Sequence, residues 1–103
     1  MLTHSTGLAP FFDFYNEHTA GELFSQDRET TINYLLTKMP LAESPRKYCI
    51  YSDTGMMILG CVVEAIAGEK LDVFVGDNIY KKLNLENTCF NPLDKGFKPE
   101  QIA

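Results

Sequence analysis

The chain has 103 residues, of which 45% are hydrophobic and 22% are charged. This composition is typical of one small globular domain and excludes a disordered chain. Nine basic residues, scattered along the sequence, stand against fourteen acidic ones and give a net charge of -5. Nucleic acid and anionic membrane surfaces are therefore not expected as partners. The sequence contains no apolar run of the roughly 18 residues that a membrane span requires, and its start does not resemble a signal peptide.

The three cysteines are odd in number and show neither a C-x-x-C pattern nor the cysteine and histidine spacing of a zinc site. They are Cys49, Cys61 and Cys89. No disulfide framework, metal site or cofactor is therefore predicted. Cys61 lies inside an apolar segment and is interpreted as a buried, unreactive thiol.

Residues 1–27 mix glycine, proline, aromatic and acidic residues without a sustained period. This pattern predicts turns and short helical pieces whose aromatic side chains fold onto a core. The first regular pattern follows Asp27, a good N-cap, and predicts an amphipathic helix over residues 28–38. Pro40 ends it. The apolar positions of this helix recur at helical spacing: Ile32, Leu35, Leu36 and Met39.

A second helix is predicted after an irregular connection with two prolines, residues 40–47, and a brief extended piece at residues 48–51. Ser52 or Asp53 serves as its N-cap, and Gly68 is placed as the glycine just past its last turn. Apolar residues cover most of the circumference of this helix, so it is expected to be central and buried.

A third helix is predicted to begin near Leu71, with the acidic Asp72 in its first turn and lysines in its last. Asn84 is expected to end it in the left-handed conformation. Residues 85–103 are rich in Asn, Pro and Gly and are predicted to form a loop. No β-α-β alternation and no period-two strand pattern is present, so the expected fold class is all-α, with three to four helices and long loops.

The strongest candidates for chemistry lie between Tyr51 and Gly55, where the loop enters the second helix. The start of a helix holds side chains firmly, offers unpaired backbone N–H groups and favours anionic groups. Tyr51 can move protons from this place, as a base where cations stabilise its phenolate or in concert with another group. The alternative interpretation is structural, namely a buried aromatic residue followed by an N-cap.

Several segments together resemble a known family of enzymes. Leu2–Leu8 has the sequence LTHSTGL, and Tyr51–Gly60 has YSDTGMMILG. Val62–Gly68 has VVEAIAG, Ile79–Leu85 has IYKKLNL and Asn87–Pro92 has NTCFNP. In this order they are similar to segments of the serine β-lactamase-like family, which includes class C β-lactamases, penicillin-binding carboxypeptidases and related esterases. The resemblance covers nearly the whole chain.

The resemblance implies three catalytic motifs, a Ser-x-x-Lys nucleophile, a Tyr-x-Asn loop and a Lys-Thr-Gly or His-x-Gly strand, of which this chain holds the middle one. Tyr51 then takes the place of the family's catalytic tyrosine, which helps to move protons during acylation and deacylation. Asp53 stands where Asn is usual; an ionised aspartate cannot donate a hydrogen bond, but it can pair with the motif lysine. Residues 52–54 also resemble the Ser-Asp-Asn loop of class A enzymes, although Gly55 and the Leu59-Gly60 pair favour alignment on Tyr51.

Other nucleophile and base candidates carry weaker signals. Ser44 and Lys47 form a literal Ser-x-x-Lys, but prolines bracket a loop there, whereas the motif needs one turn of helix, so Ser44 is not expected to be a nucleophile. Ser5 and His18 form a formal nucleophile and histidine pair. His4 falls in the first matching segment and is interpreted as a structural residue.

Taken together, the resemblance implies that residues 1–103 are a helical subdomain excised from a larger serine hydrolase of the α/β-plus-α, β-lactamase-like fold. The parent would act by acyl transfer on a small-molecule substrate (a β-lactam, a D-alanyl peptide or a small ester), while the isolated chain would be inactive. Its expected partners are the missing α/β domain and, through the apolar face exposed without that domain, a second copy. The alternative is a free-standing helical interaction module without catalysis. The cytoplasm and the cell envelope both stay open as its location.

Overall fold

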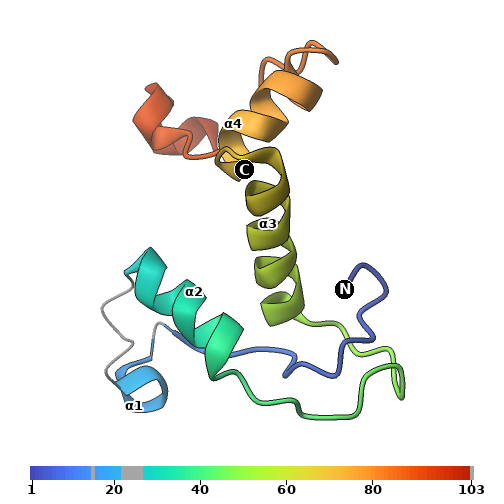
Figure 1. The fold of residues 1–103 in the computed structure, drawn as a ribbon. Helices are drawn as coiled ribbons and strands as arrows, with labels where there is room; N and C mark the ends of the chain where they lie inside the picture. The colour runs from blue at the N-terminus through green and yellow to red at the C-terminus, as the bar shows by residue number, and fades with distance from the viewer. Residues whose placement is uncertain (15, 22–26, 103) are drawn as a thin grey trace. The chain divides into compact units, whose positions relative to one another are not determined.

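A computed structural model of the chain describes residues 1–14, 16–21 and 27–102. Two compact units divide the chain, Met1–Val62 and Val63–Ala103. Within the described ranges the regular elements are helices, and β-type pairing is limited to an isolated antiparallel bridge between Leu8 and Leu41 (Figure 1). The helical character predicted for this chain is therefore confirmed.

The first unit contains the short helix α1 (Glu17–Ala20) and the longer α2 (Arg28–Thr37). α2 begins where the sequence predicts, because Asp27 Oδ2 accepts a hydrogen bond from the backbone N–H of Thr30 at 2.7 Å. Hydrogen bonds from Thr30, first from its side chain and then from its backbone, hold the pKa of the Asp27 carboxyl below its ordinary value of 3.8. The helix ends one residue before the predicted position 38.

The core of the first unit is small and partly aromatic. Its buried residues are Phe14, Leu35 and Ile58, with Leu8, Phe12, Tyr34 and Met39 packed against them. Leu35 is 3% exposed, whereas its neighbour Leu36 is 57% exposed. The predicted apolar face of α2 is therefore wrong at Leu36. Consecutive residues of a helix point about 100° apart, so the small core of the first unit can bury Leu35 and leave Leu36 exposed.

The aromatic residues of the N-terminal segment partly confirm the predicted packing. The rings of Phe12 and Phe14 lie 4.6 Å apart between centroids, and Phe12 lies 5.1 Å from Tyr34 on α2. Such tilted pairs add specific attraction to the burial of their apolar surface. Phe11 is exposed and does not join this cluster.

Helix α3 spans Asp53–Ala67, and its bounds agree with those of the second predicted helix. The expectation that it is central and buried is wrong for this chain. Only Thr54, Gly55 and Ile58 are buried on it, because the loops of the first unit cover one side of its first turns. Its exposed apolar side chains reach 83% exposure at Ile66 and include Met56, Met57 and Val62.

The second unit begins within α3, whose last residue, Ala67, is followed by Gly68 in the left-handed region at φ 72°. The predicted third helix is there but changes its hydrogen-bond pattern, since α4 (Leu71–Val75) continues into a π-helical turn, η2 (Gly76–Tyr80). Asn84 follows at φ 56° as the predicted left-handed terminator. The C-terminal loop holds two 3-10 turns that the sequence did not predict, η3 (Leu93–Lys95) and η4 (Pro99–Gln101).

Candidate functional site

The candidate site lies at the start of α3, where two irregular segments of the first unit meet (Figure 1). Residues 4–10 run beside residues 42–53 and bind them through backbone hydrogen bonds. The N–H of Ile50 donates to the carbonyl of His4 at 2.9 Å, and the N–H of Asp53 donates to that of Pro10 at 2.8 Å. The backbone on both sides of Tyr51 is therefore held by the N-terminal segment.

A buried hydroxyl cluster secures the first turn of α3. Ser52 and Thr54 are each 1% exposed, and their hydroxyl oxygens lie 3.0 Å apart. The Thr54 hydroxyl donates to the carbonyl of Ala9 at 2.6 Å, and the Ser52 oxygen lies 3.0 Å from the same carbonyl. Ser52 Oγ also accepts a hydrogen bond from the N–H of Gly55 at 3.0 Å, which makes Ser52 the N-cap of the helix.

Gly7 permits the close approach of the two segments. Its φ of +79° suits a residue without a Cβ, and a Cβ built there would lie 2.1 Å from the carbonyl oxygen of Glu43. The carbonyl of Gly7 accepts hydrogen bonds from the N–H groups of Ala42 and Glu43 at 2.8 and 3.1 Å. The loop before the site is thus joined directly to the N-terminal segment.

Tyr51 is presented to solvent on this fixed backbone. Its side chain is 66% exposed, and its ring packs against the imidazole of His4, with the centroids 4.6 Å apart and the planes tilted by 38°. Its hydroxyl makes no hydrogen bond to any residue that the structure describes. The alternative of a buried aromatic residue at this position is therefore wrong, although the N-cap that it included is observed at Ser52.

Asp53 opens α3 and is exposed. It lines a cavity of about 350 Å³ together with three phenylalanines, a methionine and two threonines: Phe11, Phe12, Phe14, Met57, Thr31 and Thr54. It contributes the only carboxylate among these described lining residues.

The Ser52 side chain, which belongs to the alternative Ser-Asp-Asn register, is not accessible in this structure. Ser52 is buried, and its hydroxyl is occupied by the hydrogen bonds of the N-cap cluster. Tyr51 and Asp53, the side chains of the other register, are both exposed.

The remaining candidates are not brought together. Lys47 Nζ lies 2.9 Å from Glu43 Oε2 and 4.9 Å from the ring centroid of Tyr48, and the loop around Ser44 is not helical. The Lys47 ammonium is thus paired with Glu43, and the bond between Lys47 and Ser44 is a backbone one, from the Lys47 N–H to the Ser44 carbonyl at 3.2 Å. The Ser5 hydroxyl pairs with Thr3 Oγ1 at 2.8 Å. Within the described ranges no contact joins Ser5 to His18, whose backbone N–H donates to Asn16 Oδ1.

Sequence reasoning missed His4 as a residue of the site. The structure places it against both Tyr51 and Ser52, since Nδ1 of its ring accepts a hydrogen bond from the Ser52 N–H at 3.2 Å. The available signal was its position in the first family-like segment. That signal did not indicate which later residue it would meet.

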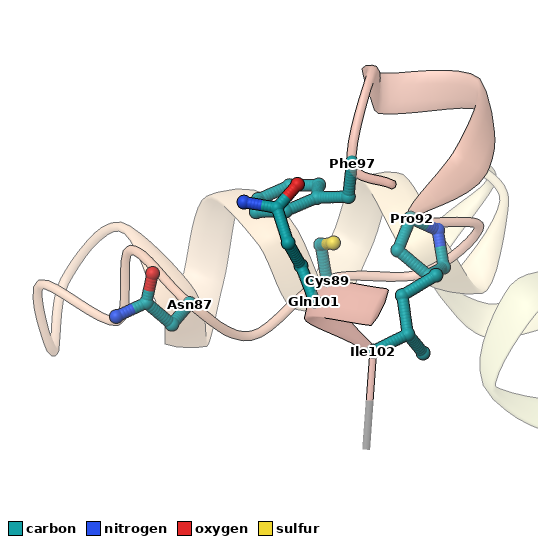
Figure 2. A pocket seen from close by; sticks show the side chains of 6 residues that line it. All are labelled: Asn87, Cys89, Pro92, Phe97, Gln101 and Ile102. Carbon is teal, nitrogen blue, oxygen red and sulfur yellow. The ribbon is translucent and has the colours of Figure 1, made fainter. Parts of the chain in front are cut away.

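A separate cavity of about 300 Å³ lies in the second unit. Figure 2 shows its lining side chains, with the Cys89 sulfur among Phe97, Pro92 and Ile102 and with the Asn87 amide standing apart. None of the predicted site residues lines it. Over residues 1–14, 16–21 and 27–102, no three His, Cys, Asp or Glu side chains gather as a metal site, and no helix is both long and apolar enough to cross a bilayer.

The comparisons with known proteins agree with the resemblance. The Beta-lactamase family matches residues 1–102. The chain is 48% identical over 103 residues to an N-acetylmuramyl-L-alanine amidase of Bacillus subtilis, which it covers to 23%. It is 46% and 44% identical to putative D-alanyl-D-alanine carboxypeptidases of Salmonella gallinarum and Escherichia coli K12, each covered to 24%.

All 103 residues of the chain take part in these matches, so the chain spans about a quarter of the length of the curated relatives it matches. No solved structure gives a significant match. The resemblance identified from the residues is confirmed by the family match over nearly the whole length. The chain belongs to the β-lactamase family.

Proposed function

We propose that this chain is the helical part of a longer serine hydrolase that cleaves D-alanyl peptides by acyl transfer. In such a reaction a serine oxygen attacks the substrate carbonyl, an acyl-enzyme ester forms, the amine leaves with a proton, and water then hydrolyses the ester. The serine and the motif lysine would come from the part of the protein outside these residues. This chain would supply Tyr51 and Asp53.

One observation carries the proposal: Tyr51 is an exposed tyrosine with a hydroxyl left free by the described residues, on a backbone held by buried hydrogen bonds. A proton-transfer group must keep its oxygen within hydrogen-bond reach of the reacting atoms, which requires a firm support. The hydroxyls of Ser52 and Thr54 are occupied by the hydrogen bonds of that support. Tyr51 therefore acts as the proton-transfer group for the serine and the leaving amine.

Asp53 has a secondary role in this proposal. As an exposed carboxylate at the start of α3, it would pair with the lysine of the nucleophile motif and hold that ammonium near the reacting serine. Because Asn is usual at this position in the family, Asp53→Asn should be tolerated.

The names of the relatives support one substrate class. The sequence leaves a β-lactam, a D-alanyl peptide or a small ester open, and two of the relatives are named as putative D-alanyl-D-alanine carboxypeptidases. The name of the third, an amidase, also denotes cleavage of an amide bond. These names favour the D-alanyl peptide over the ester.

The test compares two tyrosines in the full-length protein. Tyr51→Phe removes one hydroxyl and should lower the rate of D-alanine release from a D-alanyl-D-alanine peptide by about 10² to 10⁴, the usual contribution of a general acid or base. Tyr48→Phe is the matched control, since Tyr48 is also exposed, lies three residues earlier and packs under Lys47. Circular dichroism of all three proteins checks that the fold is kept.

Two results would contradict the proposal. If Tyr51→Phe and Tyr48→Phe react at the same rate as the unchanged protein, Tyr51 takes no part in proton transfer. If the full-length protein hydrolyses none of three substrates, namely the peptide, a chromogenic β-lactam and a nitrophenyl ester, the alternative of an interaction module without catalysis gains support. The isolated 103-residue chain is expected to be inactive on all three, because it would lack the nucleophile.

A further inference from the structure

His4 contacts three consecutive residues of the segment that carries Tyr51. Its carbonyl accepts the N–H of Ile50 at 2.9 Å, its ring packs on Tyr51 at 4.6 Å, and its Nδ1 accepts the N–H of Ser52 at 3.2 Å. The chain just after Tyr51 is also held, because the hydroxyls of Ser52 and Thr54 bond to the Ala9 carbonyl. The Tyr51 ring, among the described residues, packs against the ring of His4 alone.

The hydrogen bond from Ser52 reaches one particular nitrogen of the imidazole. A backbone N–H is a donor only, so Nδ1 of His4 is the acceptor in this bond. This bond fixes the plane of the ring. A ring fixed in plane can in turn limit the side-chain torsions of the tyrosine that lies against it.

The backbone of His4 is fitted to this task. His4 has φ 51°, in the left-handed region that few residues other than glycine adopt and in which histidine, asparagine and aspartate are enriched. Its N–H donates to the carbonyl of Met1 at 2.8 Å. The imidazole is therefore held from its own backbone as well as through Nδ1.

We propose that His4 is a positioning residue that orients the Tyr51 ring, with the Ser52 N–H fixing the imidazole against it. This inference rests on the proposed function of Tyr51 in proton transfer. An unrestrained, exposed tyrosine spreads its hydroxyl over several rotamers, and misplacement of a reacting group by about 1 Å can cost 10²-fold in rate.

The decisive variant is His4→Asn in the full-length protein. Asparagine tolerates the left-handed backbone, and its Oδ1 offers an acceptor to the Ser52 N–H, but it has no ring to pack on Tyr51. The expected result is a loss of about 10- to 100-fold in kcat for D-alanine release, with KM changed by less than about twofold. His18→Asn is the matched control, because His18 is the only other histidine and is not the one that packs on the Tyr51 ring.

A double-variant comparison separates positioning from general structure. If His4 acts through the Tyr51 hydroxyl, His4→Asn should lower the rate in the unchanged protein and lower it no further in the Tyr51→Phe protein. An equal loss in both backgrounds, or no loss in either, overturns the proposal.

A spectroscopic readout keeps the inference testable if Tyr51 proves to have no kinetic role. The NMR signals of the Tyr51 ring should lie at shifts displaced by the His4 ring, and His4→Asn should move them toward the values of a freely rotating tyrosine while His18→Asn leaves them in place. If Tyr51→Phe has no effect on the rate, the proposed function fails. The contact between His4 and Tyr51 is a separate question, and it is rejected only if the ring signals of Tyr51 stay unmoved in His4→Asn. If the signals do not move, His4 does not orient the ring.

Discussion

Replacing Gly7 by alanine should disrupt the support of the candidate site. Gly7 has a φ of +79°, and the added Cβ would lie 2.1 Å from the carbonyl oxygen of Glu43. The left-handed backbone alone costs a residue with a Cβ about 1–2 kcal/mol. The overlap is with backbone atoms, so the loop at residues 42–45 must move away from residue 7.

That movement weakens the two hydrogen bonds that the Gly7 carbonyl accepts from Ala42 and Glu43, at 2.8 and 3.1 Å. Each such bond contributes about 0.5–1.5 kcal/mol, so the free energy of unfolding should fall by about 2–5 kcal/mol when the backbone strain is included. Urea unfolding of the 103-residue chain followed by far-UV circular dichroism measures the loss, at a concentration where the chain is monomeric. Hydrogen exchange should show faster exchange of the Ala42 and Glu43 amides.

Gly68→Ala is the matched control for this experiment. Gly68 has a similar φ of +72°, but an added Cβ would find nothing within 4 Å. It should therefore show the strain of about 1–2 kcal/mol without the collision. The gain from a less flexible unfolded chain is common to both variants and cancels in the comparison. Equal destabilisation by the two variants, with protected Ala42 and Glu43 amides in Gly7→Ala, would refute the reasoning.

Three further outcomes are expected from the isolated chain. Leu35→Ala should lower the free energy of unfolding in urea by about 2–5 kcal/mol because Leu35 is 3% exposed, whereas Leu36→Ala, at a position 57% exposed, should change it by less than about 0.5 kcal/mol; equal losses would contradict the core described above. Because folding lowers the pKa of Asp27 from 3.8, the stabilisation of α2 by this residue should be complete above pH 3.8 and be lost as the pH falls through the lowered pKa. The helical circular dichroism signal should show this loss. Asp27→Asn keeps a good N-cap that does not titrate, so it should not show the loss. The exposed apolar side chains of α3, with Ile66 at 83% exposure, should make the isolated chain self-associate, so its sedimentation-equilibrium mass should rise with concentration, and a strictly monomeric chain would speak against this surface as an interface.

The sequence by itself determined where the longer helices begin and end. Asp27 caps α2, Gly68 ends α3 in the left-handed region, and Asn84 ends the helical stretch that begins at Leu71. These signals can be interpreted from sequence because capping and left-handed termination depend on one residue and its neighbours within a turn. The family motif around Tyr51 is equally local, which explains why the family could be identified from the residues alone.

Burial and long-range contact were decided only by the tertiary structure. The apolar pattern made Leu36 and most of α3 look buried, yet Leu35 is the one fully buried residue of α2, and α3 is covered only on one side of its first turns. The contact of His4 with Tyr51 and Ser52 joins residues up to 48 positions apart, and no helical or strand period relates them. Such pairings depend on how two irregular segments pass one another. Two contacts fix that path: the close approach of the two segments at Gly7, which has no Cβ, and the hydrogen bonds from the Ser52 and Thr54 hydroxyls to the Ala9 carbonyl.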